Sequence, residues 1–319
     1  MASTPQIRHS GFAALIGRPN VGKSTLLNRL TGEKLAIVSP KPQTTRNRIL
    51  GIVTRPEGQV AVLDTPGIHE AKGTLNRYMV DVALNALADV ELAIFVVEAS
   101  EGAGTQPKIG EGNRFILERL QREKKPVILA VNKVDEVQKG FLLPLIALYS
   151  NEFPFAEIIP ISAKTGDGVE LLLSKVYERL PEGPPMFDED MLTDQAERQL
   201  VAEYIREQVL RHTRQEIPYS TAVLVEHFDE TEREPRPGIK PSKNGLAGLV
   251  RIMANIYVER ESQKAIIIGK GGQMLKTIGS DARRSVERLL GTHVFLDLRV
   301  RVEERWSERP EALKKLGYE

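Results

Sequence analysis

The chain has 319 residues, of which 41% are hydrophobic, and this length is sufficient for two domains. Lys and Arg total 44 against 43 for Asp and Glu, so no overall positive charge attracts nucleic acid and any RNA contact requires a local basic patch. Cysteine is absent, which excludes disulfides and thiolate metal sites. The leader before the first expected strand is short and polar, so we expect no signal peptide. Because no long apolar run occurs, we expect no membrane-spanning helix.

The first half of the chain alternates apolar, β-branched runs with helical patterns. We expect strands at residues 13–17, 48–53, 60–64, 92–98, 127–132 and 158–162, and helices at residues 24–30, 75–88, 113–122 and 169–180. This alternation predicts an α/β fold with a doubly wound, mostly parallel sheet. Residues 54–58 are too few for a crossover helix, so the second and third strands should form an antiparallel hairpin.

A domain boundary is predicted after residue 180. Three prolines and a glycine follow Leu180 within a few residues, and they remove backbone donors and fix φ, so no helix can continue. We therefore expect a first domain at residues 1–182, a linker at residues 183–192, and a second domain with a C-terminal tail at residues 193–319.

The second domain has the pattern of an α+β fold. We expect a helix at residues 194–212, a strand at 221–228, a polar, Pro-rich surface loop or hairpin tip at 229–244, a strand at 249–259, a turn at 266–269, a helix at 274–290 and a strand at 293–302. The final residues, which include Trp306, read as a short packing tail.

A phosphate-binding loop is predicted between the first strand and the first helix, where the sequence matches G-x-x-x-x-G-K-[ST]. Its glycines let backbone N–H groups converge on phosphates, and the helix N-terminus adds partial positive charge. Lys23 should neutralise the β- and γ-phosphates and Ser24 should bind Mg²⁺. The predicted contacts are Gly17, Arg18, Pro19, Asn20, Val21, Gly22, Lys23, Ser24 and Thr25.

Two further motifs predict that the base is guanine. Asn132-Lys133-Val134-Asp135 ends a buried strand at the carboxyl edge of the sheet, and the Asp135 carboxylate can accept both guanine N1–H and N2–H₂. Adenine would leave this acid unpaired, which favours rejection. Ser162-Ala163-Lys164 follows the last strand, where we expect the Ala163 N–H to meet guanine O6.

The candidate switch elements lie around the third strand. Asp64-Thr65-Pro66-Gly67 ends that strand, which places Asp64 to hold Mg²⁺ through water and Gly67 to offer its N–H to the γ-phosphate. The polar segment 39–46 should order around γ-phosphate and metal, with Thr45, or else Thr44, as the second Mg²⁺ ligand.

Together these motifs resemble the Era family of bacterial ribosome-assembly GTPases over nearly the whole chain. The features that carry the resemblance are Pro19 and Asn20 in the phosphate loop, residues 43–46, and the three motifs that end at Gly67, Asp135 and Lys164. Where Ras-like enzymes carry a water-orienting glutamine, this chain has Ile68, so hydrolysis should be slow, about 10⁻⁴–10⁻² per second unassisted. The resemblance implies Asn20, Lys23, Thr45 and Gly67 as catalytic residues and Asn20 as a candidate K⁺ ligand.

An RNA-binding module is expected near the C-terminus. Residues 266–272 and the following helix resemble the G-x-x-G clamp of a type II KH domain, which holds about four nucleotides of single-stranded RNA. Basic residues outnumber acidic ones over residues 264–288. We expect an apolar groove lined by residues 266–268, and RNA contacts from Ile268, Gly269, Lys270, Gly271, Gly272, Lys276, Arg283 and Arg284.

The resemblance implies a GTP-hydrolysing switch that uses GTP/GDP, Mg²⁺ and K⁺, binds the 3′ end of 16S rRNA and assists assembly of the 30S subunit. Two alternatives stay open: a nucleotide-gated RNA-binding adapter in which hydrolysis is incidental, and a GTPase that acts on another RNA particle. We expect a cytoplasmic monomer with no DNA partner, and leave open a peripheral contact with the inner face of the membrane. Residues 101–112 and 231–247 exceed the expected family lengths and could alter ribosome contacts.

Overall fold

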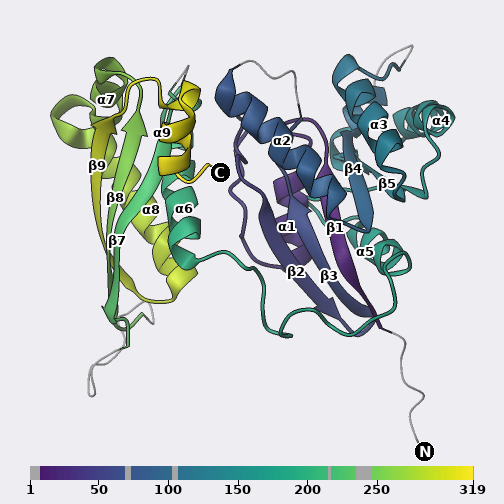
Figure 1. Cartoon of the computed structure of the whole chain (residues 1–319), viewed down its shortest axis with the longest axis horizontal. Coiled ribbons are helices and arrows are strands. Elements are labelled where there is room, and N and C mark those ends of the chain that lie inside the picture. The colour runs from purple at the N-terminus through teal and green to yellow at the C-terminus, as the bar shows by residue number, and fades with distance from the viewer. Residues whose placement is uncertain (1–7, 69–72, 103–106, 215–216, 235–245, 319) are drawn as a thin grey trace, which may run out of the picture. The chain divides into compact units, whose positions relative to one another are not determined.

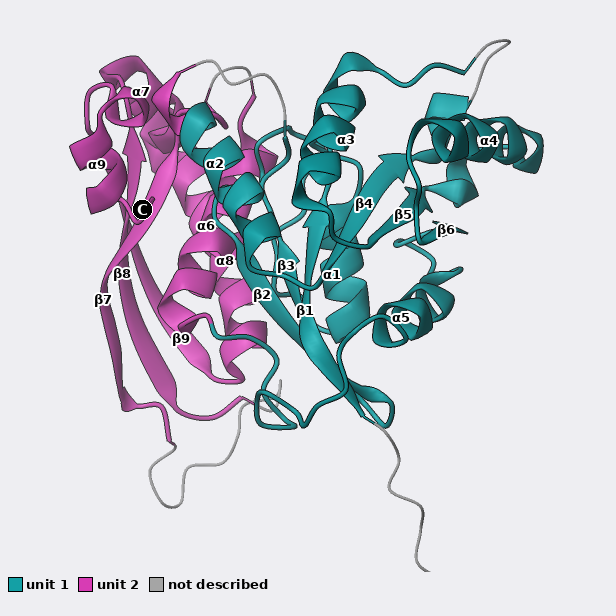
Figure 2. Cartoon of the chain, turned by 45° about the vertical axis from the view of Figure 1, so that its right-hand side comes forward, with its two compact units in different colours: residues 1–72, 76–194 teal, residues 73–75, 195–319 magenta. Residues whose placement is uncertain are grey.

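The computed structural model describes residues 8–68, 73–102, 107–214, 217–234 and 246–318. The described chain divides into two compact units, one made of residues up to 68 and 76–194, the other of residues 73–75 and 195 onward (Figures 1 and 2). Across the described residues, no helix is both long enough and apolar enough to cross a membrane.

The segment predicted as a linker, residues 183–192, lies within the first unit rather than between the two. Gln59 Nε2 donates a hydrogen bond of 3.0 Å to the Phe187 carbonyl, and the Ile52 N–H donates one of 2.8 Å to the Leu192 carbonyl. The first bond holds the segment through a side chain, and the second gives a partner to a backbone N–H on the outer side of the strand at the sheet edge.

The first unit contains a six-stranded sheet. Its strands are β1 (His9–Ile16), β2 (Ile49–Arg55), β3 (Gly58–Asp64), β4 (Leu92–Glu98), β5 (Val127–Asn132) and β6 (Glu157–Pro160). The order is β2-β3-β1-β4-β5-β6, with β2 antiparallel to β3 and the other neighbours parallel. The doubly wound, mostly parallel sheet and its hairpin are therefore confirmed.

Five α-helices surround this sheet in the described part of the first unit. They are α1 (Lys23–Thr31), α2 (Thr74–Ala88), α3 (Glu111–Glu123), α4 (Leu142–Glu152) and α5 (Val169–Tyr177), with 3₁₀ turns η1 (Ala99–Gly102), η2 (Val134–Glu136) and η3 (Lys139–Phe141). Helix α4 was not expected from the sequence. Pro144 argues against a helix there, but it lies in the first turn, where a missing N–H costs no helical hydrogen bond.

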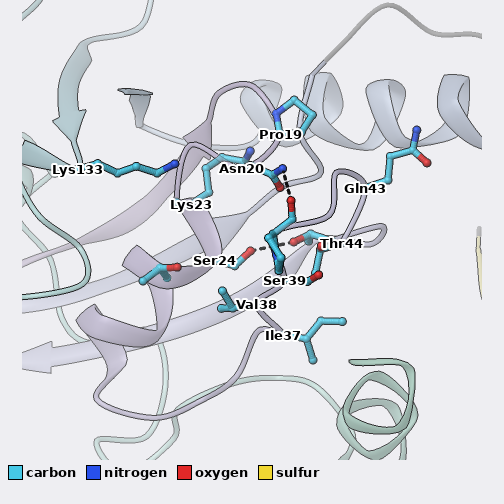
Figure 3. A pocket seen from close by; sticks show the side chains of 15 residues that line it. Pro19, Asn20, Lys23, Ser24, Ile37, Val38, Ser39, Gln43, Thr44 and Lys133 are labelled. Carbon is cyan, nitrogen blue, oxygen red and sulfur yellow. Dashed lines mark hydrogen bonds between the residues drawn. The ribbon is translucent and has the colours of Figure 1, made fainter. Parts of the chain in front are cut away.

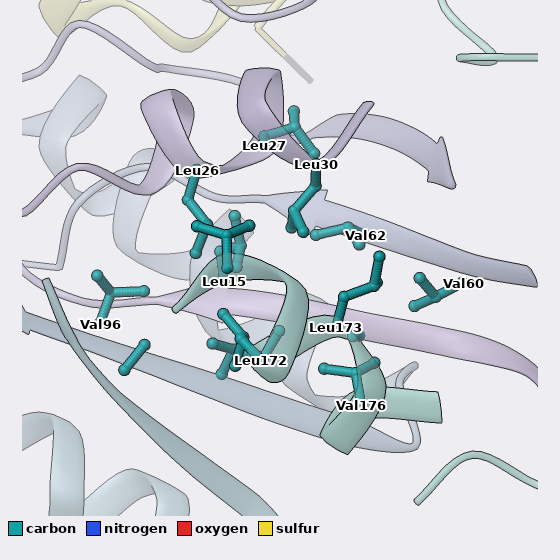
Figure 4. Close-up of a cluster of buried hydrophobic side chains, with 14 of the residues drawn as sticks. Leu15, Leu26, Leu27, Leu30, Val60, Val62, Val96, Leu172, Leu173 and Val176 are labelled. Atoms are coloured by element: carbon teal, nitrogen blue, oxygen red, sulfur yellow. The ribbon is translucent and has the colours of Figure 1, made fainter. Parts of the chain in front are cut away.

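Alternation along the strands divides the core of the first unit into two clusters. On β1, Leu15 faces one side and Ile16 the other, as the two-residue period of a strand requires. The Leu15 side packs against α1 and α5, where leucines such as Leu26 and Leu172 meet over the sheet (Figure 4). The opposite side packs against α2, α3 and α4. Both faces are covered, which explains why the strands read as continuous apolar runs.

The second unit is a three-stranded sheet with helices. Its elements are α6 (Glu197–His212), β7 (Ala222–Glu232), β8 (Leu249–Val258), α7 (Glu261–Ile268), η4 (Lys270–Gly272), α8 (Gln273–Leu290), β9 (His293–Val302), η5 (Trp306–Glu308) and α9 (Pro310–Lys315). The sheet order is β7-β8-β9, with β7 and β8 antiparallel and β8 and β9 parallel. In the tail, Trp306 stacks on Tyr318 with ring centroids 5.6 Å apart.

Two expectations for the second unit need correction. β7 continues to Glu232, into the stretch predicted as a loop, because its pairing with β8 extends that far; residues 235–245 lie outside the described part. The predicted turn at residues 266–269 is the end of the helix α7. Gln263 Oε1 accepts hydrogen bonds from the N–H groups of Glu259 and Arg260, at 2.9 and 3.2 Å, and so caps the start of this helix.

The core of the first unit provides a matched test of burial on one helix. Leu172 is 0% exposed in the cluster beneath α5, whereas its neighbour Leu171 is 54% exposed. Leu172→Ala should lower the free energy of unfolding by about 2–5 kcal/mol, because it removes buried methyl groups and leaves a cavity. Leu171→Ala should change it by less than about 0.5 kcal/mol. Urea denaturation measures both, and equal effects would contradict the packing described above.

Candidate functional site

The phosphate loop connects β1 to α1 and closes around the Lys23 side chain. Lys23 Nζ donates hydrogen bonds to the carbonyls of Gly17 and Arg18, at 3.1 and 3.0 Å. Asn20 and Gly22 adopt positive φ, 64° and 100°, and this curls the chain so that the helix begins at the end of the loop. A curled loop before a helix N-terminus presents several N–H groups on one side, as anion binding requires.

A cavity of about 460 Å³ lies against this loop (Figure 3). Predicted residues that line it are Pro19, Asn20, Gly22, Lys23, Ser24, Thr25, Thr45, Gly67 and Lys133, together with the open alternative Thr44. Ile37 and Val38 also line it and were missed, because apolar side chains before a polar segment give no functional signal. The Asn20 Nδ2 donates a 2.9 Å hydrogen bond to the Pro40 carbonyl and so joins the loop to the switch segment.

Three oxygen-bearing side chains converge beside the cavity. Ser24 Oγ lies 2.8 Å from Thr45 Oγ1 and donates a 2.6 Å hydrogen bond to Asp64 Oδ2. The other carboxylate oxygen, Asp64 Oδ1, is buried and has no hydrogen-bond partner among the described residues. Hydroxyl and carboxylate oxygens are the ligands that Mg²⁺ prefers, so this set fits the ion. The Thr44 hydroxyl instead donates to the Lys41 carbonyl at 2.6 Å.

Lys23 and Asp64 form a buried pair of opposite charges. Burial shifts the pKa of each residue more than their mutual attraction does. Burial lowers the pKa of Lys23 to about 8, and the nearby Asp64 opposes this shift. Burial likewise raises the pKa of Asp64 to about 6, and Lys23 and the Ser24 hydroxyl oppose it. Burial therefore destabilises the charged form of each residue. A bound phosphate would stabilise the charged Lys23, and a bound cation would stabilise the charged Asp64.

The base-recognition motifs lie at the ends of β5 and β6. Asn132 Nδ2 donates to the Val21 carbonyl at 2.8 Å, and Asn132 Oδ1 accepts from the Ala163 N–H at 2.9 Å. The residue therefore ties the phosphate loop to the Ser162-Ala163-Lys164 loop. Asp135 lies in η2 with its side chain exposed, free to accept from a ligand. Because Asn132 already uses the Ala163 N–H, this structure does not leave that donor open for guanine O6.

The segment after β3 packs against the phosphate loop. The Thr65 hydroxyl donates to the Leu15 carbonyl at 2.7 Å, and the Ile68 N–H donates to the Gly17 carbonyl at 3.1 Å. Ile68 is 1% exposed and belongs to the core cluster on the α2 side of the sheet. Its side chain therefore serves packing and cannot orient a water molecule in the cavity.

Several predicted contacts do not line the cavity: Gly17, Arg18, Val21, Asp64, Thr65, Pro66, Asn132, Val134, Asp135, Ser162, Ala163 and Lys164. They fall into three groups. Gly17, Arg18 and Val21 belong to the phosphate loop, where their carbonyls accept from Lys23 and Asn132. Asp64, Thr65 and Pro66 end or follow β3, and the remaining residues belong to the motifs at the ends of β5 and β6, where the base is predicted. The cavity therefore covers the phosphate end of the predicted site.

A second cavity, of about 520 Å³, lies between α8 and β9 in the second unit. It is lined by Gly272, Leu275, Lys276, Gly279, Ser280, Arg283, Leu296 and Leu298. Of the predicted RNA contacts, Gly272, Lys276 and Arg283 belong to it. Leu296 and Leu298 were missed; they occupy alternate positions of β9, a period that could have identified them.

Residues 266–268, the predicted apolar lining, are not among the residues that line this cavity. They end α7, where Ile267 is 0% exposed and Ile266 is 47% exposed. The clamp itself is formed by η4 with positive φ at Gly269, Gly271 and Gly272. Ile268, Gly269, Lys270, Gly271 and Arg284 lie outside the cavity lining, and the Arg284 guanidinium instead contacts the Asp281 carboxylate.

Comparison with family models gives two matches. Residues 12–133 match a family described as 50S ribosome-binding GTPase, and residues 216–307 match the KH domain. The second match agrees with the element order of the second unit, so the expectation of a KH fold after the GTPase fold is confirmed.

Whole-chain relatives and solved structures agree with these matches. GTPase Era of Geobacter metallireducens is 53% identical over 309 residues, with 97% of each chain covered. GTPase Era of Lacticaseibacillus paracasei is 48% identical over 310 residues, again with 97% of each covered. A crystal structure of Era in complex with MgGDPNP and nucleotides 1506–1542 of 16S ribosomal RNA superposes with a TM-score of 0.88, at 40% identity, covering 98% of this chain and 99% of that one.

A variant of Aquifex aeolicus Era bound to GDP·AlF₄⁻ superposes with a TM-score of 0.86 at 39% identity, covering 97% of this chain and 99% of that one. Both structures extend over the two units, so the similarity is not confined to the nucleotide-binding part.

The tie between the phosphate loop and the base motif can be tested at one glycine. A Cβ on Gly22 would lie 2.2 Å from Asn132 Nδ2, and φ at this position is +100°. Gly22→Ala should therefore weaken GTP binding by about a hundredfold or more, since it strains the loop and breaks a buried hydrogen bond. Gly110→Ala is the control, because φ there is −67° and a Cβ would meet no atom within 4 Å. Calorimetry with GTP measures both; an unimpaired Gly22→Ala protein would contradict the tie.

Proposed function

The chain belongs to the GTPase Era family, and from that premise we propose that it binds the 3′ end of 16S rRNA through its KH domain and assists assembly of the 30S ribosomal subunit while GTP is bound. As a member of this family, the protein is a GTP-hydrolysing enzyme with a P-loop GTPase domain followed by a KH domain. The proposal adds the RNA sequence, the particle and the order of events.

The phosphate end of the site is proposed to hold Mg²⁺ together with GTP or GDP. Ser24, Thr45 and, through water, Asp64 would hold the ion, which would neutralise charge on the phosphates. The unpartnered Asp64 Oδ1 supports this assignment. Lys23, which is buried and lines the same cavity, would add a positive charge beside the phosphates. The N–H groups of the phosphate loop would orient the triphosphate. The Era structure that contains MgGDPNP has the same fold over the whole chain.

Asn20 is proposed to hold a monovalent cation near the phosphates. Its side chain is exposed at the cavity, and its amide nitrogen is occupied by the Pro40 carbonyl. The amide oxygen has no hydrogen-bond donor among the described residues, so it can coordinate a cation. A charge at this point would stabilise the transition state in the way that an arginine finger does. Ile68 supplies no such assistance.

Replacement of K⁺ by Na⁺ tests the Asn20 assignment. Single-turnover hydrolysis should be at least about tenfold faster in K⁺, because the larger ion matches a site that the smaller one fills poorly. Asn20→Ala should remove the difference between the two salts while GTP binding stays within a few-fold. Rapid-quench measurement of phosphate release provides both rates. A wild-type rate that is the same in both salts would exclude the proposed ion.

The observation that carries the RNA proposal is the cavity between α8 and β9. Lys276 and Arg283 project from one helix into a groove whose other wall is apolar, and the glycine clamp lies at its end. Cations beside an apolar groove suit a single strand whose phosphates lie on one side and whose bases lie on the other. In the similar Era structure the bound RNA is nucleotides 1506–1542 of 16S ribosomal RNA, which supports the proposed sequence.

A GTPase acting on another RNA particle is the second candidate function. The family description that matches residues 12–133 names the 50S ribosome, whereas the whole-chain relatives are Era proteins. The KH domain favours the small-subunit proposal, because the 50S description covers only the first unit. The remaining alternative is a nucleotide-gated RNA-binding adapter in which hydrolysis is incidental. It differs from the proposed function only in that release from precursor subunits would not need GTP turnover.

Binding to defined oligonucleotides tests the RNA proposal. Fluorescence anisotropy should give much tighter binding to the 3′ end of 16S rRNA than to a scrambled RNA of the same composition. The double change Lys276→Ala with Arg283→Ala should weaken binding at least about tenfold and reduce the salt slope by roughly 1.4, since two phosphate contacts are lost.

The matched control is Arg122→Ala with Lys139→Ala, which removes two exposed cations from the first unit and should change neither value. The titrations are repeated with a GTP analogue and with GDP to give the direction of coupling. Equal binding of the 3′ end and the scrambled RNA would contradict the small-subunit assignment, and preference for 50S rRNA fragments would favour the second candidate.

A further inference from the structure

The helix that begins at the phosphates also reaches the base-recognition loop from its other end. Arg29 lies in the last turn of α1. Its Nε donates a 3.1 Å hydrogen bond to the Ala163 carbonyl, and its terminal Nη2 donates a second one to the Lys164 carbonyl. No function has been given to Arg29 in the motifs above, although it is bonded to two successive residues of one of them.

The bond to the Ala163 carbonyl fixes the orientation of the peptide between Ala163 and Lys164, and the bond to the Lys164 carbonyl fixes the next peptide. In a trans peptide the C=O and the N–H point in opposite directions, so an Ala163 carbonyl that faces Arg29 turns the Lys164 N–H away from it. That N–H has no hydrogen-bond acceptor within the described part of the chain. The preceding donor, the Ala163 N–H, is used by Asn132 Oδ1 at 2.9 Å. Of the two neighbouring donors, the one that Arg29 orients is therefore the open one.

The loop around this peptide is built to keep the arginine in place. Gly166, with φ at +95°, lies beside it, and a Cβ there would be 4.0 Å from the nearest Arg29 atoms. The loop is also closed on itself, because the Gly166 N–H donates to the Ser162 carbonyl at 2.8 Å and the Thr165 N–H donates to Ser162 Oγ at 3.1 Å. A closed loop held at two carbonyls by a charged group has little freedom to rotate the peptide.

We infer that Arg29 is a positioning residue for base specificity, which orients the Lys164 N–H toward O6 of guanine. The inference rests on the proposed binding of GTP and GDP at this site. Asp135 accepts from guanine N1–H and N2–H₂ but reads nothing at the sixth position. A fixed N–H there can donate a hydrogen bond to guanine O6. It cannot bond to the 6-amino group of adenine, because that group is also a donor.

The side chain can be changed without damage to the core, because Arg29 is exposed and its neighbours Leu27 and Leu30 supply buried contacts of α1. Adjacent Asn28 also holds a loop. Asn28 Oδ1 accepts from the N–H groups of Leu35 and Ala36, at 2.9 and 2.8 Å. Asn28 and Arg29 therefore hold different loops, and of these two residues Arg29 holds the Ser162-Ala163-Lys164 loop.

The test compares GDP, 6-thio-GDP and IDP by calorimetry. Sulfur in place of O6 is a weak acceptor but leaves N1–H and N2–H₂ unchanged, whereas inosine lacks only the 2-amino group that Asp135 reads. Arg29→Met should weaken GDP binding by about tenfold, since charged hydrogen bonds no longer fix the peptide. It should weaken 6-thio-GDP binding much less, so the preference for GDP over 6-thio-GDP shrinks. The preference for GDP over IDP should stay as in the wild type.

Two further variants separate positioning from general damage. Arg29→Lys keeps a charged donor and should restore most of the preference. Arg179→Met is the matched control, because Arg179 also donates to a main-chain carbonyl, that of Ala156, at 3.1 Å, but far from the base motifs at the start of β6. Arg29→Gln, which keeps a single amide donor group, repeats the measurement if Arg29→Met does not fold, and it should give a smaller loss of preference.

Each outcome decides the inference. An unchanged preference for GDP over 6-thio-GDP in Arg29→Met, or an equal loss in Arg179→Met, would overturn the role of Arg29. A fall in all three affinities by the same factor would also overturn it, because general loosening of the site would explain that result. Wild-type protein that binds none of the three nucleotides would refute the proposed function instead, so the two failures are distinguishable.

Discussion

The side-chain amide of Asn132 is the contact on which the nucleotide site depends. It donates to the carbonyl of Val21 in the phosphate loop and accepts from the N–H of Ala163 in the loop after β6, and it is 2% exposed. These segments are far apart in the sequence and come from different strands, so their relative position is not set by local geometry. An amide that uses both its donor and its acceptor in a buried place is costly to replace, because either partner would remain unsatisfied.

The second constraint is electrostatic. Lys23 and Asp64 are both buried, and burial moves the pKa of each toward its neutral form. The fold therefore keeps two ionisable groups where burial disfavours the charged form of each. Phosphate and a metal ion would stabilise both charged forms by supplying counter-charges. Sites arranged in this way give up stability of the free protein for binding. The core clusters on both faces of the sheet offset that cost.

Periodicity and motif spacing predicted most of the fold, and the missed features arise from tertiary structure. The strands were predictable because they are apolar on both faces, and the hairpin because residues 54–58 are too short for a crossover. α4 was missed because Pro144 resembles a helix breaker when its position in the first turn is unknown. Of the site, the motifs identified most of the phosphate-loop residues that line the cavity, such as Lys23 and Ser24. They could not indicate that Asn132 occupies the Ala163 N–H or that Arg29 reaches the same loop, because those contacts depend on how the elements pack.

The placement of the cavity residues and the loop anchors along α1 has a consequence for how its length can vary. Lys23 and Ser24 lie in its first turn, whereas Asn28 and Arg29, which hold two separate loops, lie in its last. One inserted residue between these pairs would rotate the later side chains by about 100° around the axis and carry them about 1.5 Å along it. Both loop anchors would then point elsewhere, and the buried Leu26 and Leu27 between the pairs would be displaced as well, so this stretch does not tolerate a change of helical phase. Beyond Gly32, where the helix has ended, the chain is released from that restriction.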